Sequence, residues 1–205
     1  MAALSGCDSP AALAQKIAET QKTWLLNKEQ LEGLEHLHAE FARLIGDRFS
    51  TLENVKRPVK AGVAFVDQTS NAWFVYSMTR PSVIFLCSMD GLDGDLILDL
   101  SPVLENALVA PEQENREAQL GRIAADMVSD LEQVWKPVTR LRCSQIVPHS
   151  DPFSMGVAPM YETGLLFAFT MPATEEAEEL PGLARIFYPA RRSIHSVLDA
   201  VTAGV

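Results

Sequence analysis

Apolar residues recur every three or four positions in two long stretches of the chain, which is the spacing of an amphipathic helix. The first stretch follows Asn27, a favourable N-cap residue that Gln30 is placed to complete as a capping box, and it predicts a helix from Lys28 to about Asn54. The second stretch predicts a helix from about Arg116 to Trp135. A shorter helix is predicted from Ser9-Pro10 to about Trp24.

Each long helix is followed by runs of β-branched and aromatic residues between turn residues, a pattern typical of strands. Four such runs follow the first long helix: Val59–Asp67, Trp73–Met78, Val83–Met89 and Leu96–Leu100. Four more follow the second: Val138–Val147, Phe153–Ala158, Leu165–Thr170 and Leu183–Tyr188. A short helix that begins at Ser101-Pro102 closes the first series, and a helix over Arg191–Val201 closes the second.

The order of elements therefore repeats, and individual residues match at an offset of 79 positions. Leu44 matches Ile123, and Arg57-Pro58-Val59 matches Lys136-Pro137-Val138. A fixed offset indicates two copies of one unit. We therefore expect an α/β (α+β) fold with pseudo-two-fold symmetry, in which two helix–four-strand–helix repeats share one sheet and core and long helices pack on that sheet.

The composition describes an acidic, folded protein. Hydrophobic residues make up 47% of the chain, and 27 Asp and Glu residues against 17 Lys and Arg residues give a net charge of −10. This balance argues against a nucleic acid or an anionic membrane surface as the main partner. Three scattered cysteines argue against a disulfide framework and a thiolate zinc site. We find no signal peptide and no run of about 20 apolar residues, so we expect no membrane insertion and a cytoplasmic location.

Motifs for cofactors and metals are weak. His36 and His38 are two residues apart on a predicted helix and do not share a face, so we expect surface or capping roles rather than metal ligation. The aromatic residues of the predicted strands are interpreted as sheet and core residues. The acidic stretch Ala173–Gly182 is interpreted as a solvated loop, with a docking loop for a basic partner as the alternative. No cofactor is predicted.

One segment resembles a known family. The stretch Asn27-Lys-Glu-Gln-Leu-Glu-Gly-Leu-Glu-His-Leu-His-Ala-Glu-Phe-Ala-Arg43 is similar to the opening helix of the middle domain of the flagellar motor switch protein FliM. Arg57-Pro58-Val59 and Trp135-Lys-Pro-Val138 lie where that family has comparable features. The resemblance covers about Asn27 to Val201 and implies a CheC-like domain over residues 27–205. The residue pattern predicts a helical extension over residues 1–26 and repeats at about 27–110 and 112–203.

The family implies a non-enzymatic role in the cytoplasmic switch ring at the flagellar basal body, in rotation switching and chemotaxis. Its implied partners are FliG-like and FliN-like proteins, CheY and neighbouring copies of the chain. Three departures matter: residues 1–26 lack the acidic–hydrophobic peptide that captures phosphorylated CheY, a Gly-Gly-x-Gly loop is missing, and no FliN-pairing domain follows before Val205. The shortened loop at Val109, Ala110 and Pro111 is the predicted FliG-like contact.

Two alternatives stay open. The first is a CheC-like phosphatase or CheY binder, for which Glu112 and Asn115 have the spacing Glu-x-x-Asn. The amide of such a pair orients the water that attacks an aspartyl phosphate. When the family is aligned on Lys136-Pro137-Val138, however, the pair falls on Glu117 and Leu120. In the first copy it falls on His38 and Phe41. Neither position for the asparagine carries an amide, so the phosphatase motif is disfavoured. The second is an adaptor outside the rotor.

Overall fold

The computed structural model describes residues 26–78, 83–92, 95–156 and 159–188, together with Leu198 and Val201. In chain order the elements are α2 (Lys28–Phe49), β1 (Gly62–Ser70), α3 (Asn71–Ser77), β2 (Val83–Asp90), β3 (Asp95–Leu100), α4 (Pro102–Leu108), α5 (Arg116–Trp135), β4 (Arg142–His149), β5 (Thr163–Met171) and β6 (Leu180–Tyr188). The helix expected before Trp24 lies outside the described residues, and of the helix expected over Arg191–Val201 only the helical Leu198 and Val201 are described.

The strands form one antiparallel sheet in the order β1-β5-β6-β3-β2-β4. If β1 is exchanged with β4, β2 with β5 and β3 with β6, the same order is read backwards, as a two-fold axis between β3 and β6 requires. The irregularities match as well: Ala64 is the extra residue where β1 pairs with β5, and Ser144 is the extra residue where β4 pairs with β2. These two bulges are 80 positions apart, one more than the offset that the sequence predicts.

The predicted fold class is confirmed, but each half contributes three strands to the sheet rather than four. The segment Trp73–Met78, predicted as a strand, is α3 up to Ser77. The hydroxyl of Ser70 accepts a hydrogen bond from the Trp73 N–H at 3.2 Å and starts this helix. The described part of the strand predicted over Phe153–Ala158 consists of turn and irregular backbone.

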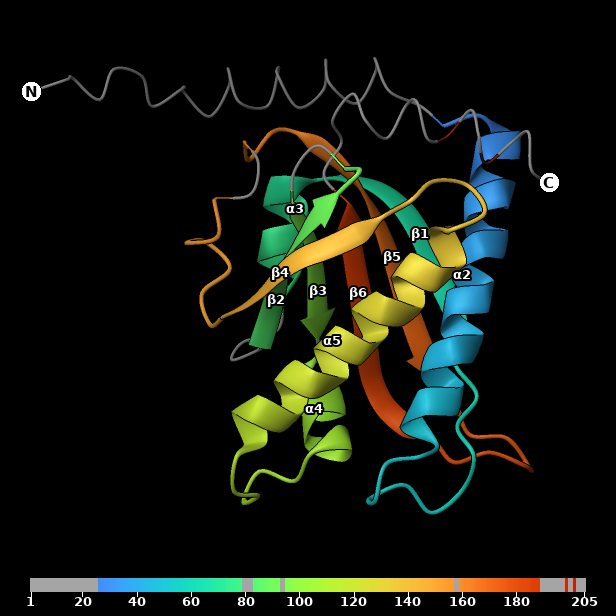
Figure 1. Ribbon diagram of the computed structural model, residues 1–205, viewed down its shortest axis with the longest axis vertical. Helices are drawn as coiled ribbons and strands as arrows, with labels where there is room; N and C mark the ends of the chain where they lie inside the picture. The colour runs from blue at the N-terminus through green and yellow to red at the C-terminus, as the bar shows by residue number, and fades with distance from the viewer. Residues whose placement is uncertain are drawn as a thin grey trace, which may run out of the picture.

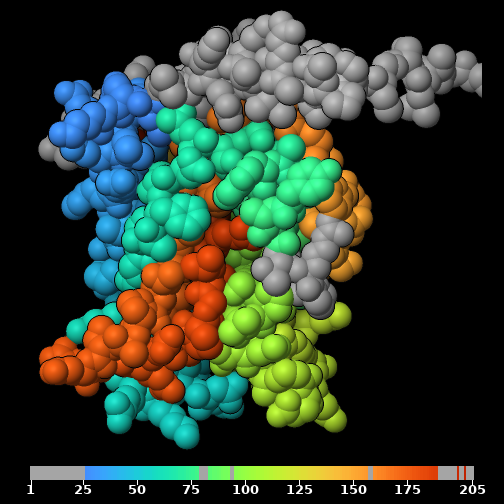
Figure 2. Space-filling model, turned by 180° about the vertical axis from the view of Figure 1, so that it is seen from behind, coloured from blue at the N-terminus to red at the C-terminus, as the bar shows by residue number. Residues whose placement is uncertain are grey.

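Helices lie on both faces of the sheet, but they cover one face more completely than the other. Helices α2 and α5 cross one face, with α4 beside them at the lower edge (Figure 1). The opposite face carries α3, which lies over one end of the sheet (Figure 2). The main core therefore lies between the sheet and α2, α4 and α5, and a smaller cluster around Phe74 and Phe187 lies under α3. No helix in the described ranges is long and apolar enough to span a bilayer.

The long helices begin where the sequence predicts. Asn27 and Gln30 form the capping box, with bonds of 2.8 and 3.1 Å, and α5 covers the predicted Arg116–Trp135. Helix α2 ends at Phe49 rather than near Asn54, because Ser50 folds the chain back. Its hydroxyl donates to the Gly46 carbonyl and accepts from the Val59 N–H, both at 2.7 Å.

The segments that precede β1 and β4 also differ from expectation. These strands begin at Gly62 and Arg142 rather than at Val59 and Val138. After α5, the backbone N–H groups of Val138 and Thr139 still donate to the Trp135 carbonyl, both at 2.9 Å. Residues 136–138 therefore form a turn, and strand pairing starts only after it.

Candidate partner-binding site

A hollow of about 350 Å³ lies at the end of the molecule where the α4–α5 loop meets the turns after α2. Both segments lie at the bottom of Figure 1. Its lining comprises Leu52, Glu53 and Asn54 after α2, Leu108, Val109 and Gln113 from α4 and the loop, and Gln119, Arg122, Ile123 and Asp126 from α5. The hollow therefore combines apolar side chains with amides and charges of both signs.

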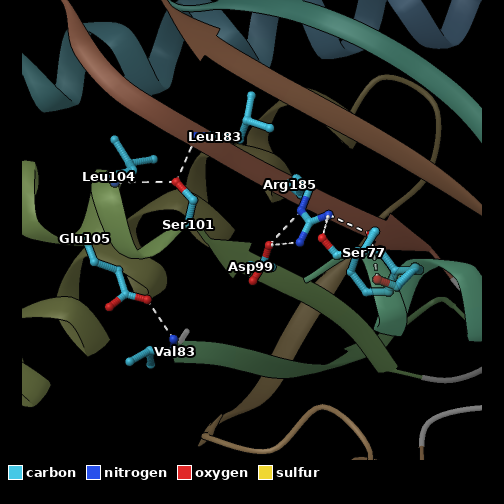
Figure 3. A network of polar contacts seen from close by, with 9 residues as sticks. Ser77, Val83, Asp99, Ser101, Leu104, Glu105, Leu183 and Arg185 are labelled. Carbon is cyan, nitrogen blue, oxygen red and sulfur yellow. Dashed lines mark hydrogen bonds and ion pairs between the residues drawn. The ribbon is translucent and has the colours of Figure 1, made fainter. Parts of the chain in front are cut away.

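Helix α4 is fixed at its N-terminus. Ser101 is its N-cap, and the Ser101 hydroxyl accepts hydrogen bonds from the N–H of Leu104 at 3.4 Å and of Leu183 at 2.9 Å (Figure 3). The start of β6 approaches so closely that a Cβ on Gly182 would lie 2.3 Å from the Ser101 oxygen, and Gly182 has φ +102°. Only glycine fits this position without strain, and α4 is thereby attached to the sheet.

The loop after α4 is held by Arg116, the first residue of α5. Its guanidinium donates to the Val109 carbonyl, to the Asn106 side-chain oxygen at 3.0 Å and to Glu105 Oε2 at 3.4 Å. The amide of Asn54 donates to the Leu108 carbonyl at 3.4 Å from the other side. These bonds satisfy carbonyls at the C-terminal end of α4, so the loop has a fixed shape.

Glu105 is the buried acid of this end of the molecule. Burial raises its pKa, while the hydrogen bonds from the Val83 N–H and from Arg116 act in the opposite direction. Glu105 Oε1 accepts from the Val83 N–H at 2.6 Å (Figure 3), and Oε2 accepts from Arg116 Nη2 at 3.4 Å. Because both oxygens have partners within the fold, Glu105 connects α4, β2 and α5 and has a structural role.

The predicted contact residues lie together on this loop. Val109 is buried and lines the hollow beside Leu108, Ala110 is half-buried, and Pro111 is exposed. The tip of the loop therefore projects beyond a fixed base. Whether these residues touch a partner stays a prediction.

The alternative phosphatase pair is not assembled on a helix. Glu112 lies in an exposed turn, and Asn115 is the N-cap of α5 with φ 61°, where its side chain makes no capping hydrogen bond. At the aligned positions, Glu117 is exposed on α5 but Leu120 is buried in the core. Neither α2 nor α5 contains an asparagine. The long helices thus offer no asparagine amide for a Glu-x-x-Asn pair.

His38 lies in the core, where the expectation of a surface or capping role is wrong. Its Nδ1 donates to the Leu34 carbonyl at 2.8 Å, so Nε2 accepts from the Tyr188 hydroxyl at 2.9 Å, and the Trp135 indole N–H donates to that hydroxyl at 3.1 Å. The His38 ring also stacks on Phe167 at 3.5 Å between centroids. Burial lowers the pKa of His38 to about 3, so the imidazole is neutral.

Other features were not predicted from the sequence. Arg116 as a loop clamp has no sequence signature, because its partners are backbone and side-chain oxygens brought near only by folding. The exposed aromatics Trp73, Tyr76 and Phe153 were interpreted as sheet or strand residues, and the Ser70 cap was the signal for a helix there. Among the described residues, no group of three His, Cys, Asp or Glu side chains is arranged to hold a metal ion.

Comparison with known proteins gives related sequences. The chain is 29% identical over 117 residues to the flagellar motor switch protein FliM of Treponema pallidum, a match that covers 53% of this chain and 33% of that protein. It is 29% identical over 103 residues to FliM of Borreliella burgdorferi, covering 49% of this chain and 29% of the relative. The chain thus spans about a third of the length of the curated relatives it matches. No protein-family model matches it.

Solved structures share the fold. The FliM middle domain from H. pylori has a TM-score of 0.72 at 22% identity, covering 85% of this chain and 99% of that one. FliM in the FliG–FliM complex from H. pylori has a TM-score of 0.71 at 21% identity, covering 85% and 100%. FliY from Thermotoga maritima has a TM-score of 0.66 at 13% identity, covering 89% and 100%. The chain therefore resembles FliM in sequence and has the fold of the FliM middle domain.

Proposed function

We propose that this chain is a non-enzymatic structural component of the flagellar motor switch, and that the α4–α5 loop with the adjoining hollow binds a FliG-like protein. The observation that carries the proposal is its likeness to FliM: 29% identity in sequence, and a fold shared with FliM in a FliG–FliM complex along the whole of that chain. The clamp on the loop supports it, because a preformed loop loses little conformational entropy on binding.

In this role the chain lies in the cytoplasm at the flagellar basal body and contributes to rotation switching and chemotaxis. FliN-like proteins, CheY and neighbouring copies are the further partners that this role implies. A two-layer core with clamped connections suits a body that tilts as a unit when a partner moves. Catalysis is not part of the proposal, and the burial of Leu120 and the absence of asparagine from α2 and α5 support that choice.

Titration calorimetry with a FliG middle domain tests the proposed contact. We expect a dissociation constant on the order of tens of micromolar, and a loss of about tenfold or more for Ala110→Asp and for Arg122→Glu, because both place a negative charge at the hollow. Lys28→Glu is the matched control, since it reverses an exposed charge at the other end of α2. Equal affinity of all variants, or no binding at several hundred micromolar, contradicts the proposal.

A further inference from the structure

The two halves of the molecule have matching corners where a long helix leads into an edge strand. The first corner, Lys56–Lys60, precedes β1, and the second corner, Lys136–Arg142, leads into β4. Both carry the basic residue–Pro–Val sequence, as Arg57-Pro58-Val59 and Lys136-Pro137-Val138. The segment that packs on the first corner therefore indicates which kind of segment the second corner is able to bind.

The first corner binds an acidic segment of the chain itself. Glu178, in the loop between β5 and β6, accepts hydrogen bonds from the backbone N–H of Lys56 at 2.8 Å and of Arg57 at 3.0 Å. The Glu178 N–H in turn donates to the Pro58 carbonyl at 2.9 Å. Two residues earlier, Glu176 forms an ion pair with Lys60 at 2.9 Å. A turn over Thr174–Ala177 and the residue that follows it thus place two carboxylates, those of Glu176 and Glu178, along this corner.

The second corner has no such cover among the described residues. The connection that would supply it, between Asp90 and Asp95, is shorter than the one between Met171 and Leu180. Its Gly91 abuts the corner, since a Cβ there would lie 2.9 Å from the Arg140 carbonyl oxygen. The side chains of Lys136, Arg140 and Arg142 are exposed, and none forms an ion pair with a residue that the structure describes.

These three cations border a hollow of about 790 Å³ whose other wall is the last turns of α5, with Ser129, Glu132 and Gln133. Glu132, the acid in this wall, accepts a hydrogen bond from the Cys143 N–H at 2.6 Å. A second hollow of about 400 Å³ shares Ser129 and Glu132 and follows β4 as far as Ile146. The two hollows form a groove between α5 and β4.

Among the described strands, β4 is at the edge of the sheet and pairs with β2 alone. The outer side of an edge strand presents backbone donors and acceptors to which an extended peptide can add. We propose that the groove beside β4 binds an acidic, extended segment of a partner protein, with its carboxylates facing Lys136, Arg140 and Arg142. Three exposed cations that form no ion pair with a described residue, in a chain of net charge −10, make the site selective for acidic segments.

A labelled peptide with the sequence of Ala173–Gly182 is the probe, because this segment shows in the first half how carboxylates meet such a corner. Fluorescence anisotropy at about 20 mM salt is expected to give a dissociation constant of about 100 µM, weakening several-fold at about 300 mM. The combined variant Lys136→Gln, Arg140→Gln, Arg142→Gln is expected to bind about tenfold more weakly or worse. A peptide with glutamines for its glutamates is expected to lose the same affinity.

The control variant Lys28→Gln, Arg43→Gln, Lys56→Gln removes the same charge elsewhere and is expected to bind the peptide like the wild type. Equal binding by the first variant, equal binding of the glutamine peptide, or no saturable binding below about 1 mM overturns the proposal. The proposal is also overturned if sedimentation shows that the wild type is a dimer and the first variant a monomer, because the cations would then join copies of this chain. Binding to FliG involves another surface, so the two proposals fail separately.

Discussion

The two halves of the molecule share their strands, bulges and long helices but differ in the connection between the first and second strands. In the first half that connection contains α3, whereas in the second half it has no helix among its described residues, 150–156 and 159–162. The two connections touch, because the N–H groups of Asn71 and Ala72 donate to the carbonyls of Glu162 and Met160, both at 2.8 Å. The shared core preserves the symmetry, and the connections and corners are free to diverge.

Among the polar contacts that join the halves are three pairs of side chains, each with one partner from either side of the axis. Asp99 on β3 meets Arg185 on β6, His38 on α2 meets Tyr188 on β6, and Arg48 on α2 meets Asp130 on α5. Each half therefore completes the core of the other. If the halves depend on each other in this way, breaking a contact lowers the free energy of unfolding of the whole molecule, and the more deeply buried the contact is, the larger the loss.

The buried pair of Asp99 and Arg185 gives the largest expected effect. Two bonds of 2.6 and 2.7 Å join them, and Arg185 also donates to the Ser77 hydroxyl at 2.9 Å (Figure 3). Asp99→Ala leaves a buried guanidinium without its carboxylate, so we expect a loss of about 3–5 kcal/mol in the free energy of unfolding, measured with urea. The double variant Asp99→Leu, Arg185→Met is expected to regain most of it. A loss under about 1 kcal/mol for Asp99→Ala contradicts the role of this pair.

The pH dependence of stability tests the contact of His38 with Tyr188. The folded-state pKa of His38 is about 3 against 6.5 for the unfolded chain, so between these values the unfolded chain binds more protons and stability falls as pH falls. From pH 7 to pH 5 we expect a loss of about 2 kcal/mol from this group. In His38→Gln that part of the slope disappears, although the variant is less stable at pH 7. Identical slopes in urea titrations of both proteins refute the assignment.

The pair of Arg48 and Asp130 gives the smallest effect across the axis. Its two bonds of 2.6 and 2.7 Å are partly shielded, whereas Arg43 and Asp47 form an exposed pair within α2 at 2.6 Å. In double-mutant cycles we expect a coupling of about 1 kcal/mol for the first pair and a clearly smaller coupling for the second, which water and salt screen. If the coupling energy of Arg43 and Asp47 equals that of Arg48 and Asp130, contacts between the halves do not differ from contacts within one half.

Most of the core was predictable from the sequence, because hydrophobic spacing reports directly which face of an element is buried. The limits of α5 follow from that spacing, whereas the capping box of α2 follows from Asn27 and Gln30, and the repeat offset follows from matches of individual residues. Helix α3 was not predictable in this way: it has only seven residues, too few to display a helical period, and Trp73, Phe74, Val75 and Tyr76 all favour strands. The Ser70 cap decides its conformation.

The candidate site was predictable only in part. The family resemblance indicated Val109, Ala110 and Pro111, but no periodicity reveals that Arg116 clamps this loop or that Asn54 reaches the Leu108 carbonyl. The acidic stretch was interpreted as a solvated loop, and its glutamates are mostly exposed, yet Glu178 binds the backbone after α2. Hydrogen bonds between side chains and distant backbone depend on the finished fold, so the sequence pattern does not contain them.

The most direct test of the central claim is an NMR titration of the full chain with a FliG middle domain, which follows backbone amide shifts residue by residue. We expect saturable shifts concentrated at residues 52–54, 108–113 and 119–126, with α3 and β4 unaffected. Shifts confined to α3 or β4, or the absence of any saturable shift, would contradict the proposed contact of the α4–α5 end with a FliG-like protein.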